Sequence, residues 1–425
     1  MRILLVSSEY PPESPGGLGN SVHNLAAGLR ACGAHPHILS SRPCSADGTS
    51  TVEEDEGGIP VTRIPRTDKR WRGAPSWFWR FHPYYTPVDR FRYSLRVADA
   101  CREIIQRKSI DLVQFADYGG EGFAFVGAAH GIPTVVRLAT PLYLVDEINR
   151  AHVAAGRMPT VRRPAGARAL LKILEQKPIR EARAVASPSR SLARIIEREA
   201  EPKGTVRIIP TGIDLGHFTR RNAVDAREAA ANCNIGAGRM ILCVGRYEYR
   251  KGMHDLIDAF ARICTRLPQY TLVFAGGDTE TAPGGGSMKE YCARRAAEHG
   301  ISDRIRLLDR VSYEALPGLY SLAALFVAPS LYENLANTVL EAMACGLPVI
   351  STTSGGASEI IDDPANGTLV PASDPEALAN AILELLDDSD RCTIIGETNA
   401  RKARLEFSRE TMAERFLDLY WLIRR

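Results

Sequence analysis

Residues 328–352 read APSLYENLANTVLEAMACGLPVIST, and they show most clearly how this chain folds. Residues 325–328 are apolar and predict a strand, residues 336–345 predict a helix, and residues 349–351 predict the next strand. A helix that connects two short apolar strands is typical of a sheet of parallel strands.

The same alternation continues along the chain. Further short strands are predicted at residues 2–7, 112–115, 134–138, 184–186, 206–209, 240–244, 271–275 and 305–308. The turn-rich residues 210–218 (PTGIDLGHF) separate two such series. We therefore predict an α/β fold of two Rossmann-like, doubly wound parallel-sheet domains that face an interdomain cleft, where ligands of such folds bind.

The composition is that of a folded chain with more than one domain. Of the 425 residues, 45% are hydrophobic and 24% are charged, which excludes a disordered protein. No apolar run reaches the roughly 18 residues that a membrane span needs, and residues 1–12 do not resemble a signal peptide. The nine cysteines never form a CxxC pair, which predicts reduced thiols in a cytoplasmic protein.

Charge is distributed unequally between the two series. Up to residue 213 the chain has 30 Lys and Arg against 21 Asp and Glu, a net charge of +9, whereas the remainder has 23 against 29, a net charge of −6. An anionic partner or substrate of the basic half would explain this difference, and solvated surface helices explain it equally well.

The first loop of the chain contains glycines at residues 16–19 (GGLG), directly before a helix that Asn20 and Ser21 are expected to cap. Glycines allow the backbone to approach a ligand closely, and the amides of a helix N-terminus favour a phosphate or a polar sugar. A simple tight turn is the alternative. The usual dinucleotide and P-loop signatures are absent from this loop.

A second loop, residues 244–253 (VGRYEYRKGM), places Arg246 and Lys251 after a predicted strand. Two cations at the carboxyl end of a strand can clamp a diphosphate, although exposed basic residues are common in such loops.

The third loop is part of residues 328–352. Glu333 precedes the predicted helix and Glu341 lies within it, and carboxylates are strong acceptors for vicinal hydroxyl groups. The amides near Asn337 and Thr338 are suited to a phosphate. An amphipathic helix with acidic residues on its exposed side is the alternative.

These three loops, in this order and spacing, resemble the retaining glycosyltransferases of family GT4, which have the GT-B fold. Supporting segments are residues 187–189 (SPS), residues 209–214 (IPTGID) and Gly355-Gly356 with Glu359. The resemblance implies an N-terminal acceptor-side domain of residues 1–213 plus 408–425 and a C-terminal nucleotide-sugar-binding domain of residues 214–407. The last helix, with an apolar stripe in residues 408–425, is then expected to return to the first domain.

The resemblance also assigns roles to individual residues. Arg246 and Lys251 would neutralise the leaving diphosphate, Glu333 would contact the donor sugar, and Glu341 would bind the ribose hydroxyls. The donor-binding residues are then Gly16, Gly17, Gly19, Arg310, Val311, Asn337, Thr338 and Glu341, with the backbone of Arg310 and Val311 at the nucleotide base.

The chain departs from the family pattern after the fourth strand of the first domain. Many members have an HxH-like segment there, whereas this chain has Asp117 and Glu121 and no histidine. Both carboxylates are candidate catalytic groups, which would bind the donor sugar or accept the proton of the acceptor, and helix capping is the alternative role.

Residues 63–96 are basic and aromatic, with nine Lys and Arg and nine aromatic residues, among them Trp71, Trp77 and Trp79. Aromatic side chains stack on sugars, and basic-aromatic segments also settle on anionic membranes. The prolines interrupt an amphipathic helix and favour a role at the acceptor, while peripheral contact with the inner face of the membrane and simple packing on the first domain stay open.

The predicted function is that of a hexosyltransferase (EC class 2.4), which moves a hexosyl unit from an NDP-sugar, linked to UDP or GDP, to a hydroxyl acceptor with retention. The acceptor would be a glycan, a lipid-linked intermediate or a natural product, and an anionic one fits the basic half. The NDP-sugar serves as co-substrate, no metal or other cofactor is required, and no nucleic acid partner is expected. The alternatives are an NDP-sugar epimerase on the same fold and a sugar-binding protein without activity.

Overall fold

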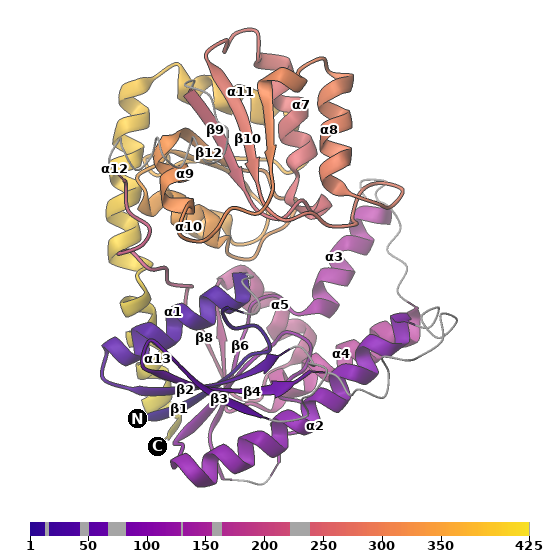
Figure 1. Ribbon diagram of the computed structural model, residues 1–425, viewed down its shortest axis with the longest axis vertical. Coiled ribbons are helices and arrows are strands. Elements are labelled where there is room, and N and C mark those ends of the chain that lie inside the picture. Colours follow the sequence, from indigo (N-terminus) through magenta and orange to yellow (C-terminus); the bar gives the residue numbers. More distant parts are fainter. Residues whose placement is uncertain are drawn as a thin grey trace. The chain divides into compact units, whose positions relative to one another are not determined.

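The computed structural model describes residues 1–12, 17–42, 51–66, 82–128, 131–154, 164–221 and 239–424 (Figure 1). The chain divides into two compact units. The first unit consists of Met1–Ile148, Val161–Gly212 and Arg409–Arg425, and the second unit consists of Asn149–Thr160 and Ile213–Ser408.

A sheet of eight strands forms the centre of the first unit, in the order β3-β4-β2-β1-β5-β6-β7-β8. Its strands are β1 (Arg2–Val6), β2 (His35–Arg42), β3 (Val52–Glu56), β4 (Ile59–Pro65), β5 (Leu112–Ala116), β6 (Thr134–Arg137), β7 (Ala184–Ser187) and β8 (Thr205–Ile208). Neighbouring strands pair in parallel except for the edge strand β3, which pairs antiparallel with β4.

Helices cover both faces of this sheet. They are α1 (Gly17–Ala31), α2 (His82–Lys108), α3 (Leu142–Ala154, in this unit up to Ile148), α4 (Ala165–Glu181), α5 (Arg190–Ala200) and α13 (Arg409–Arg424). Strand β1 shows why its sequence is a continuous apolar run. Ile3 and Leu5 join one core with α1 and α13, whereas Leu4 and Val6 join a second core with α2 and α5.

The last helix, α13, packs on α1 within the first unit (Figure 1). Phe416 and Tyr420 are fully buried there, and the hydroxyl of Tyr420 donates a hydrogen bond to Oε1 of Gln114 on β5 (2.7 Å). The guanidinium of Arg424 pairs with the carboxylate of Asp111 (2.7 Å). The apolar stripe of this helix is therefore buried against elements of the first unit.

The second unit contains a fully parallel sheet of six strands in the order β11-β10-β9-β12-β13-β14. Its strands are β9 (Arg239–Val244), β10 (Tyr270–Ala275), β11 (Ile305–Leu308), β12 (Ala323–Ala328), β13 (Val349–Thr352) and β14 (Thr368–Val370). Its helices are α7 (Met253–Ile263), α8 (Met288–Glu298), α9 (Leu316–Leu322), α10 (Asn337–Ala344), α11 (Pro375–Leu386) and α12 (Ser389–Glu406). The 3-10 turns are Tyr249–Lys251, Ser302–Arg304 and Ala357–Glu359.

Every strand that the sequence predicts is present to within two residues at each end. The sequence missed β2, β3, β4 and β14, and with β3 it missed the antiparallel edge of the first sheet. The predicted cap was also wrong, because α1 already begins at Gly17, so that Asn20 and Ser21 lie within the helix.

Three further predictions concern the rest of the chain. Among the described residues, no helix combines the length and the apolar composition that crossing a bilayer requires. The seven cysteines in the described ranges are free thiols, and five of them are buried. The tryptophans of the basic-aromatic segment (Trp71, Trp77, Trp79) and Gly16 lie outside the described residues.

Candidate functional site

The first candidate site lies in the second unit, where β9 and β12 end. After β9, residues Tyr249–Lys251 form a 3-10 turn, which Gly252 ends with a φ of 67°. A side chain at Gly252 would be strained at this φ and would clash with the carbonyl of Pro329 in the loop after β12. The glycine therefore lets the two loops approach each other closely.

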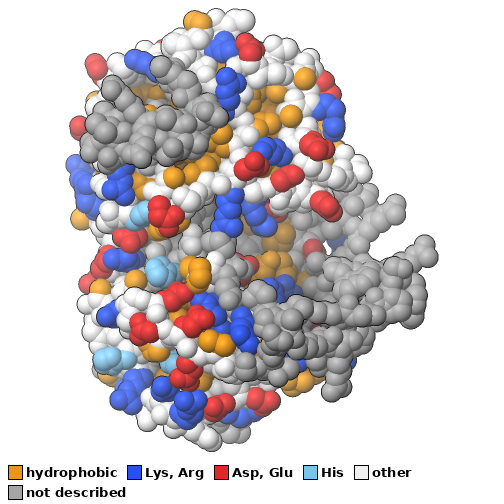
Figure 2. Space-filling view, viewed as in Figure 1, with side chains coloured by type: hydrophobic (Ala, Val, Ile, Leu, Met, Phe, Trp, Pro, Cys, Tyr) orange, Lys and Arg blue, Asp and Glu red, His pale blue; other side chains and the backbone are white. Residues whose placement is uncertain are grey.

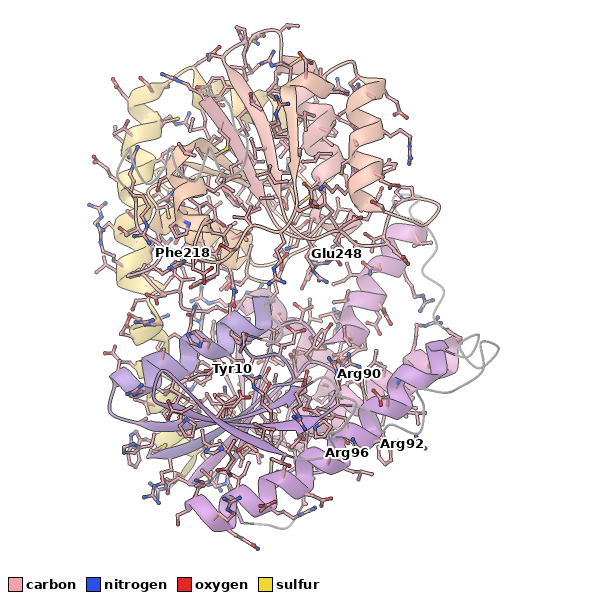
Figure 3. All side chains as sticks on the ribbon, in the orientation of Figure 1. Tyr10, Arg90, Arg92, Arg96, Phe218 and Glu248 are labelled. Carbon is pink, nitrogen blue, oxygen red and sulfur yellow. The ribbon has the colours of Figure 1, made fainter. Side chains whose placement is uncertain are left out.

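Side chains from these two loops form a charged cluster, which we define as Arg246, Glu248, Arg250, Lys251 and Glu333. The ammonium of Lys251 donates a hydrogen bond to Oε2 of Glu333, and Arg250 donates to the same oxygen (3.2 Å). Arg250 also pairs with Glu248 (3.3 Å), and so does Arg246 (3.2 Å). Glu248 marks the position of the cluster in Figure 3.

The charges of this cluster keep its carboxylates ionised. Burial would raise the pKa of Glu333, but Lys251 and Arg250 outweigh this effect and lower the pKa to about 2. Burial likewise opposes ionisation of Glu248, and the three cations of the cluster lower its pKa. With three cations and two carboxylates, the charged cluster carries a net charge of +1.

Exposure differs among the three cations. The side chain of Arg246 is 67% exposed, whereas those of Arg250 and Lys251 are 12% and 19% exposed. Arg250 further donates to the carbonyl of Tyr332 (2.7 Å) and thereby fixes the loop after β12. On the face of the second unit that Figure 2 shows, basic side chains lie beside acidic ones rather than in one large basic area.

The sequence missed Arg250 and Glu248, which lie between the two cations that it identified. Their segment, RYEYRK, contained the signal, since its three cations can form ion pairs with its one carboxylate and with Glu333 in the other loop. Only the 3-10 turn shows that Arg250 points toward Glu333.

Gly355 and Gly356 also belong to this site. Gly355 has a φ of 74° and lies so close to the backbone of Glu333 that a side chain would clash with its carbonyl. The amide of Gly356 donates a hydrogen bond to that carbonyl (3.1 Å). The glycine pair that the sequence singled out thus supports the loop that carries Glu333.

Helix α10 follows this loop, with Asn337 and Thr338 as its first two residues. Glu341 is buried in the same helix and accepts a hydrogen bond from the hydroxyl of Tyr320 on α9 (2.8 Å). Burial raises the pKa of Glu341 to about 7, and the bond from Tyr320 opposes this only in part. Glu341 is therefore a buried acid that, unlike Glu333, has no ion pair among the described residues.

The predicted base-binding residues lie in the loop after β11. Arg310 is exposed, and Val311 is partly buried against the core of the second unit. Both residues follow the carboxyl end of a parallel strand, which is where such sheets bind ligands. The role of these two residues stays a prediction.

The second candidate site lies in the first unit, after β5. Asp117 and Glu121 are each 1% exposed. Oδ1 of Asp117 accepts a hydrogen bond from the amide of Ala139 (3.0 Å), and Oε1 of Glu121 accepts one from the amide of Ser8 (2.8 Å). The second oxygen of each carboxylate has no hydrogen-bond partner among the described residues. The amides of Ala139 and Ser8 lie in loops and not at helix ends, which argues against the capping alternative.

Glu175 on α4 is a third buried carboxylate here, and no pattern in the sequence pointed to it. It accepts hydrogen bonds from the amides of Gly119 (2.6 Å), Leu142 (3.0 Å) and Tyr143 (2.9 Å). Glu175 thus joins the loop between Asp117 and Glu121 to the start of α3. We call Asp117, Glu121 and Glu175 the buried carboxylates.

Burial raises the pKa of all three buried carboxylates, to about 7 for Glu175. The nearby cation Arg90 on α2 lies over the ring of Tyr118 (5.3 Å) and opposes the effect on Glu121 and Glu175 (Figure 3). No ion pair of these three carboxylates occurs in the described ranges. Glu175 is therefore suited to exchange a proton near neutral pH, and Asp117 and Glu121 hold a proton more tightly than an exposed carboxyl does.

The glycine loop before α1 is described only from Gly17 onward, with Gly17 and Gly19 in the first turn of the helix. Arg137 at the end of β6 donates to the carbonyl of Ser21 in this helix (3.0 Å). The described residues contain no group of three or more His, Cys, Asp or Glu side chains that could hold a metal ion. The expectation that no metal is required stays a prediction.

The family model Glycosyltransferase Family 4 matches residues 15–217, and the family model Glycosyl transferases group 1 matches residues 228–402. A D-inositol 3-phosphate glycosyltransferase of Salinispora tropica is 30% identical over 296 residues, which are 67% of this chain and 59% of that protein. The chain thus spans about three fifths of the length of that relative. A glycogen synthase of Mycobacterium tuberculosis is 27% identical over 430 residues, which are 100% of this chain and 95% of that protein.

Solved structures show the same fold. A sucrose-phosphate synthase of Thermosynechococcus elongatus superposes with a TM-score of 0.76 at 23% identity, over 99% of this chain and 98% of that one. Anabaena HepE in complex with UDP and glucose superposes with a TM-score of 0.68 at 18% identity, over 98% of both chains. The predicted arrangement of two Rossmann-like domains, the GT-B fold, is confirmed by these likenesses.

Proposed function

This chain belongs to the glycosyltransferases of family 4, and from that premise we propose that it moves a hexosyl unit from a nucleoside diphosphate sugar to a hydroxyl acceptor. The family membership implies retention at the anomeric carbon. In the reaction, the bond between the anomeric carbon and the diphosphate oxygen breaks, the acceptor oxygen forms the new bond, and its proton is released.

The charged cluster carries this proposal. Negative charge increases on the diphosphate as its bond to the sugar breaks, and fixed cations that stabilise such charge are a large source of catalysis. Arg246 is exposed for contact with a ligand, and the ammonium of Lys251 is held in place by Glu333. We assign both cations to the diphosphate, and Glu333 to the positioning of Lys251 and to the donor sugar.

Other residues of the second unit are assigned to the remainder of the donor. The amides of Asn337 and Thr338 lie at the start of α10, where helix amides favour phosphate. Glu341 would accept hydrogen bonds from the ribose, and the backbone of Arg310 and Val311 would contact the base. Gly17 and Gly19 are assigned to the sugar and diphosphate by family membership alone.

The first unit is assigned to the acceptor. Asp117 and Glu121 have raised pKa values, so either carboxylate can take up the proton of an acceptor hydroxyl or hold a sugar hydroxyl. Positive charge from Arg66 and Arg90 acts on Glu121. Since these arginines also suit a phosphate, we propose an anionic acceptor, in line with the name of the D-inositol 3-phosphate glycosyltransferase relative.

The cations of the charged cluster allow the reaction without a metal, so chelation by EDTA should leave the turnover unchanged.

A donor screen tests the proposal. The protein is incubated with UDP-glucose, GDP-mannose or ADP-glucose and a set of sugar and inositol phosphates, and the released nucleoside diphosphate and the mass of the product are measured. We expect one donor to give product, and Lys251→Ala to lower its turnover by about 100-fold. Lys402→Ala is the control, because Lys402 on α12 also pairs with a carboxylate and is 10% exposed. Equal turnover in the two variants, or no product from any donor, would contradict the proposal.

A further inference from the structure

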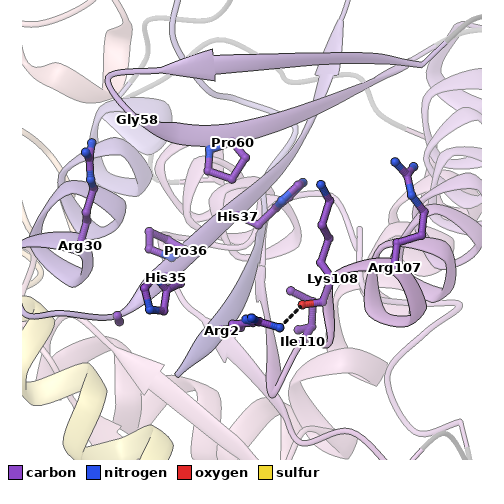
Figure 4. Close-up of a pocket in the computed structure, with 11 residues that line it drawn as sticks. Arg2, Arg30, His35, Pro36, His37, Gly58, Pro60, Arg107, Lys108 and Ile110 are labelled. Carbon is purple, nitrogen blue, oxygen red and sulfur yellow. Dashed lines mark hydrogen bonds between the residues drawn. The ribbon is translucent and has the colours of Figure 1, made fainter.

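A pocket with a volume of about 450 Å³ lies in the first unit, at the end of the sheet where the parallel strands begin (Figure 4). Asp117 lies at the other end, where the strands finish. It is formed where β1 and β2 begin, beside the hairpin of β3 and β4 and the last turn of α2. Its lining residues are Arg2, Arg30, Ala34, His35, Pro36, His37, Gly58, Pro60, Arg107, Lys108 and Ile110. Four of them are cationic, and this lining contains no acidic side chain among the described residues.

Two of the cations are fixed by neutral groups. The guanidinium of Arg2 donates a hydrogen bond to the carbonyl of Lys108 (3.2 Å), and that of Arg30 donates to the carbonyl of Gly57. Carbonyl oxygens hold these guanidinium groups in place without neutralising them. Since a guanidinium has five N–H donors, both arginines keep donors for a further acceptor.

The neighbouring acids have partners other than the side chains of Arg2, Arg30 and Lys108. Glu53 and Glu103 both pair with Arg107 (3.2 and 3.1 Å). Asp111 pairs with Arg424 (2.7 Å) and accepts a hydrogen bond from the amide of Arg2 (2.8 Å), and Asp55 accepts one from the amide of Gly58 (2.6 Å). The ammonium of Lys108 is exposed and forms no ion pair within the part of the chain that the structure describes. The side chains of three cations, Arg2, Arg30 and Lys108, therefore line the pocket without an ion pair to any described residue.

The remaining walls suit a small organic molecule. Nε2 of His37 lies 2.8 Å from the hydroxyl of Thr62, and the burial of His37 lowers its pKa to about 4, which keeps the ring neutral. Pro36, Pro60 and Ile110 provide apolar surface. Basic side chains and histidines also gather at the lower end of the first unit in the space-filling view (Figure 2).

We propose that this pocket binds a soluble small molecule with a phosphate monoester. Such a group carries close to two negative charges, which three uncompensated and partly fixed cations can bind. The volume is within the range of small-molecule sites. Sheets of parallel strands bind their substrates at the carboxyl ends of the strands. This pocket lies at the amino ends, so it is a second site, separate from the site of the proposed reaction.

Calorimetry with phenyl phosphate tests this proposal. We expect saturable binding to one site that survives Lys251→Ala and is weakened about tenfold by Lys108→Gln and by Arg30→Gln. Arg102→Gln is the control, since Arg102 is an exposed cation on α2 like Lys108 and does not line the pocket. No activity is measured, so the result is independent of the proposed function.

Three outcomes would overturn the proposal. The first is the absence of saturable binding, and the second is equal weakening by Arg102→Gln and Lys108→Gln. The third is flotation with vesicles of phosphatidylcholine and phosphatidic acid that Lys108→Gln abolishes and phenyl phosphate does not compete for, which would assign the cations to a lipid headgroup. Circular dichroism confirms beforehand that each variant is folded.

Discussion

Glu333 in the second unit and Asp117 in the first unit are both carboxylates in loops that follow parallel strands, yet their pKa values are shifted in opposite directions. Two cations contact Glu333 and lower its pKa to about 2, whereas Asp117 is buried, has no ion pair within the described ranges, and has a raised pKa. The difference shows that close cations, rather than shielding from water, determine which carboxylate keeps its charge. It also separates the roles that we propose for the two units. The charged cluster of the second unit supplies fixed charge, and the buried carboxylates of the first unit supply proton acceptors.

Arg250→Ala should have the largest effect, because it breaks the charged cluster. Glu248 and Glu333 would lose a partner that is 12% exposed, and loss of one member of a shielded ion pair costs about 3 kcal/mol of the free energy of unfolding. Urea denaturation measures this loss. If charge imbalance is its cause, the double variant Arg250→Ala/Glu333→Gln should be more stable than Arg250→Ala alone; a double variant that is less stable would contradict the assignment.

Arg246→Ala should separate function from stability in the same cluster. Its side chain is 67% exposed, so the free energy of unfolding should hardly change, while turnover should fall by about 100-fold through the loss of a cation at the diphosphate. Steady-state kinetics and thermal unfolding are measured on the same preparation. Turnover close to that of the wild type would remove Arg246 from the site.

Glu175→Gln tests the buried carboxylates through pH. The pKa of Glu175 is raised from 4.5 to about 7, so the folded state binds its proton more tightly than the unfolded state. The resulting stabilisation is complete below pH 4.5 and is lost as pH rises through 7. Between pH 5 and pH 8 the wild type should therefore lose about 2 kcal/mol more of its free energy of unfolding than Glu175→Gln. Parallel pH profiles of the two proteins would show that this carboxyl does not titrate as described.

The pH dependence of donor binding through Glu341 should be the smallest of these effects. Glu341 extends the comparison of Glu333 with Asp117, because it is a buried acid like Asp117 but lies in the second unit like Glu333. Its pKa of about 7 means that it is mostly protonated at pH 6 and mostly ionised at pH 8. Since the ionised carboxylate is the stronger acceptor for ribose hydroxyls, donor affinity should be about fivefold higher at pH 8 than at pH 6. Glu341→Gln should abolish this pH dependence, and Glu341→Ala should weaken the donor at both pH values. A donor affinity that Glu341→Ala leaves unchanged would exclude contact with the ribose.

The elements that the sequence predicted well are those with a continuous apolar run between helices, such as β1 and β9. The missed strands β2 and β4 contain prolines (HPHILSSR and IPVTRIP), which argue against a strand, and β3 (VEEDE) is charged as an edge strand is. Periodicity alone could not identify them. Their arrangement depends on pairing between strands, since β2 pairs with β1 and β4 pairs with β2 and β3.

The candidate sites were predictable only where the residue type itself carries the chemistry. Arg246, Lys251 and Glu333 were identified as cations and a carboxylate at strand ends, and the structure brings them into one cluster. Glu175 was missed because its partners are backbone amides, which every residue has and which only the fold brings together.

The central claim is that the charged cluster binds the diphosphate of the donor, and nucleotide binding tests it without any need for the acceptor. Calorimetry of UDP, GDP and ADP compares the wild type, the double variant Arg246→Ala/Lys251→Ala and the control Lys402→Ala. We expect the wild type and the control to bind the same nucleotide equally well, and the double variant to bind it at least 100-fold more weakly, as the loss of two charge-assisted contacts requires. Equal affinity in all three proteins would contradict the account.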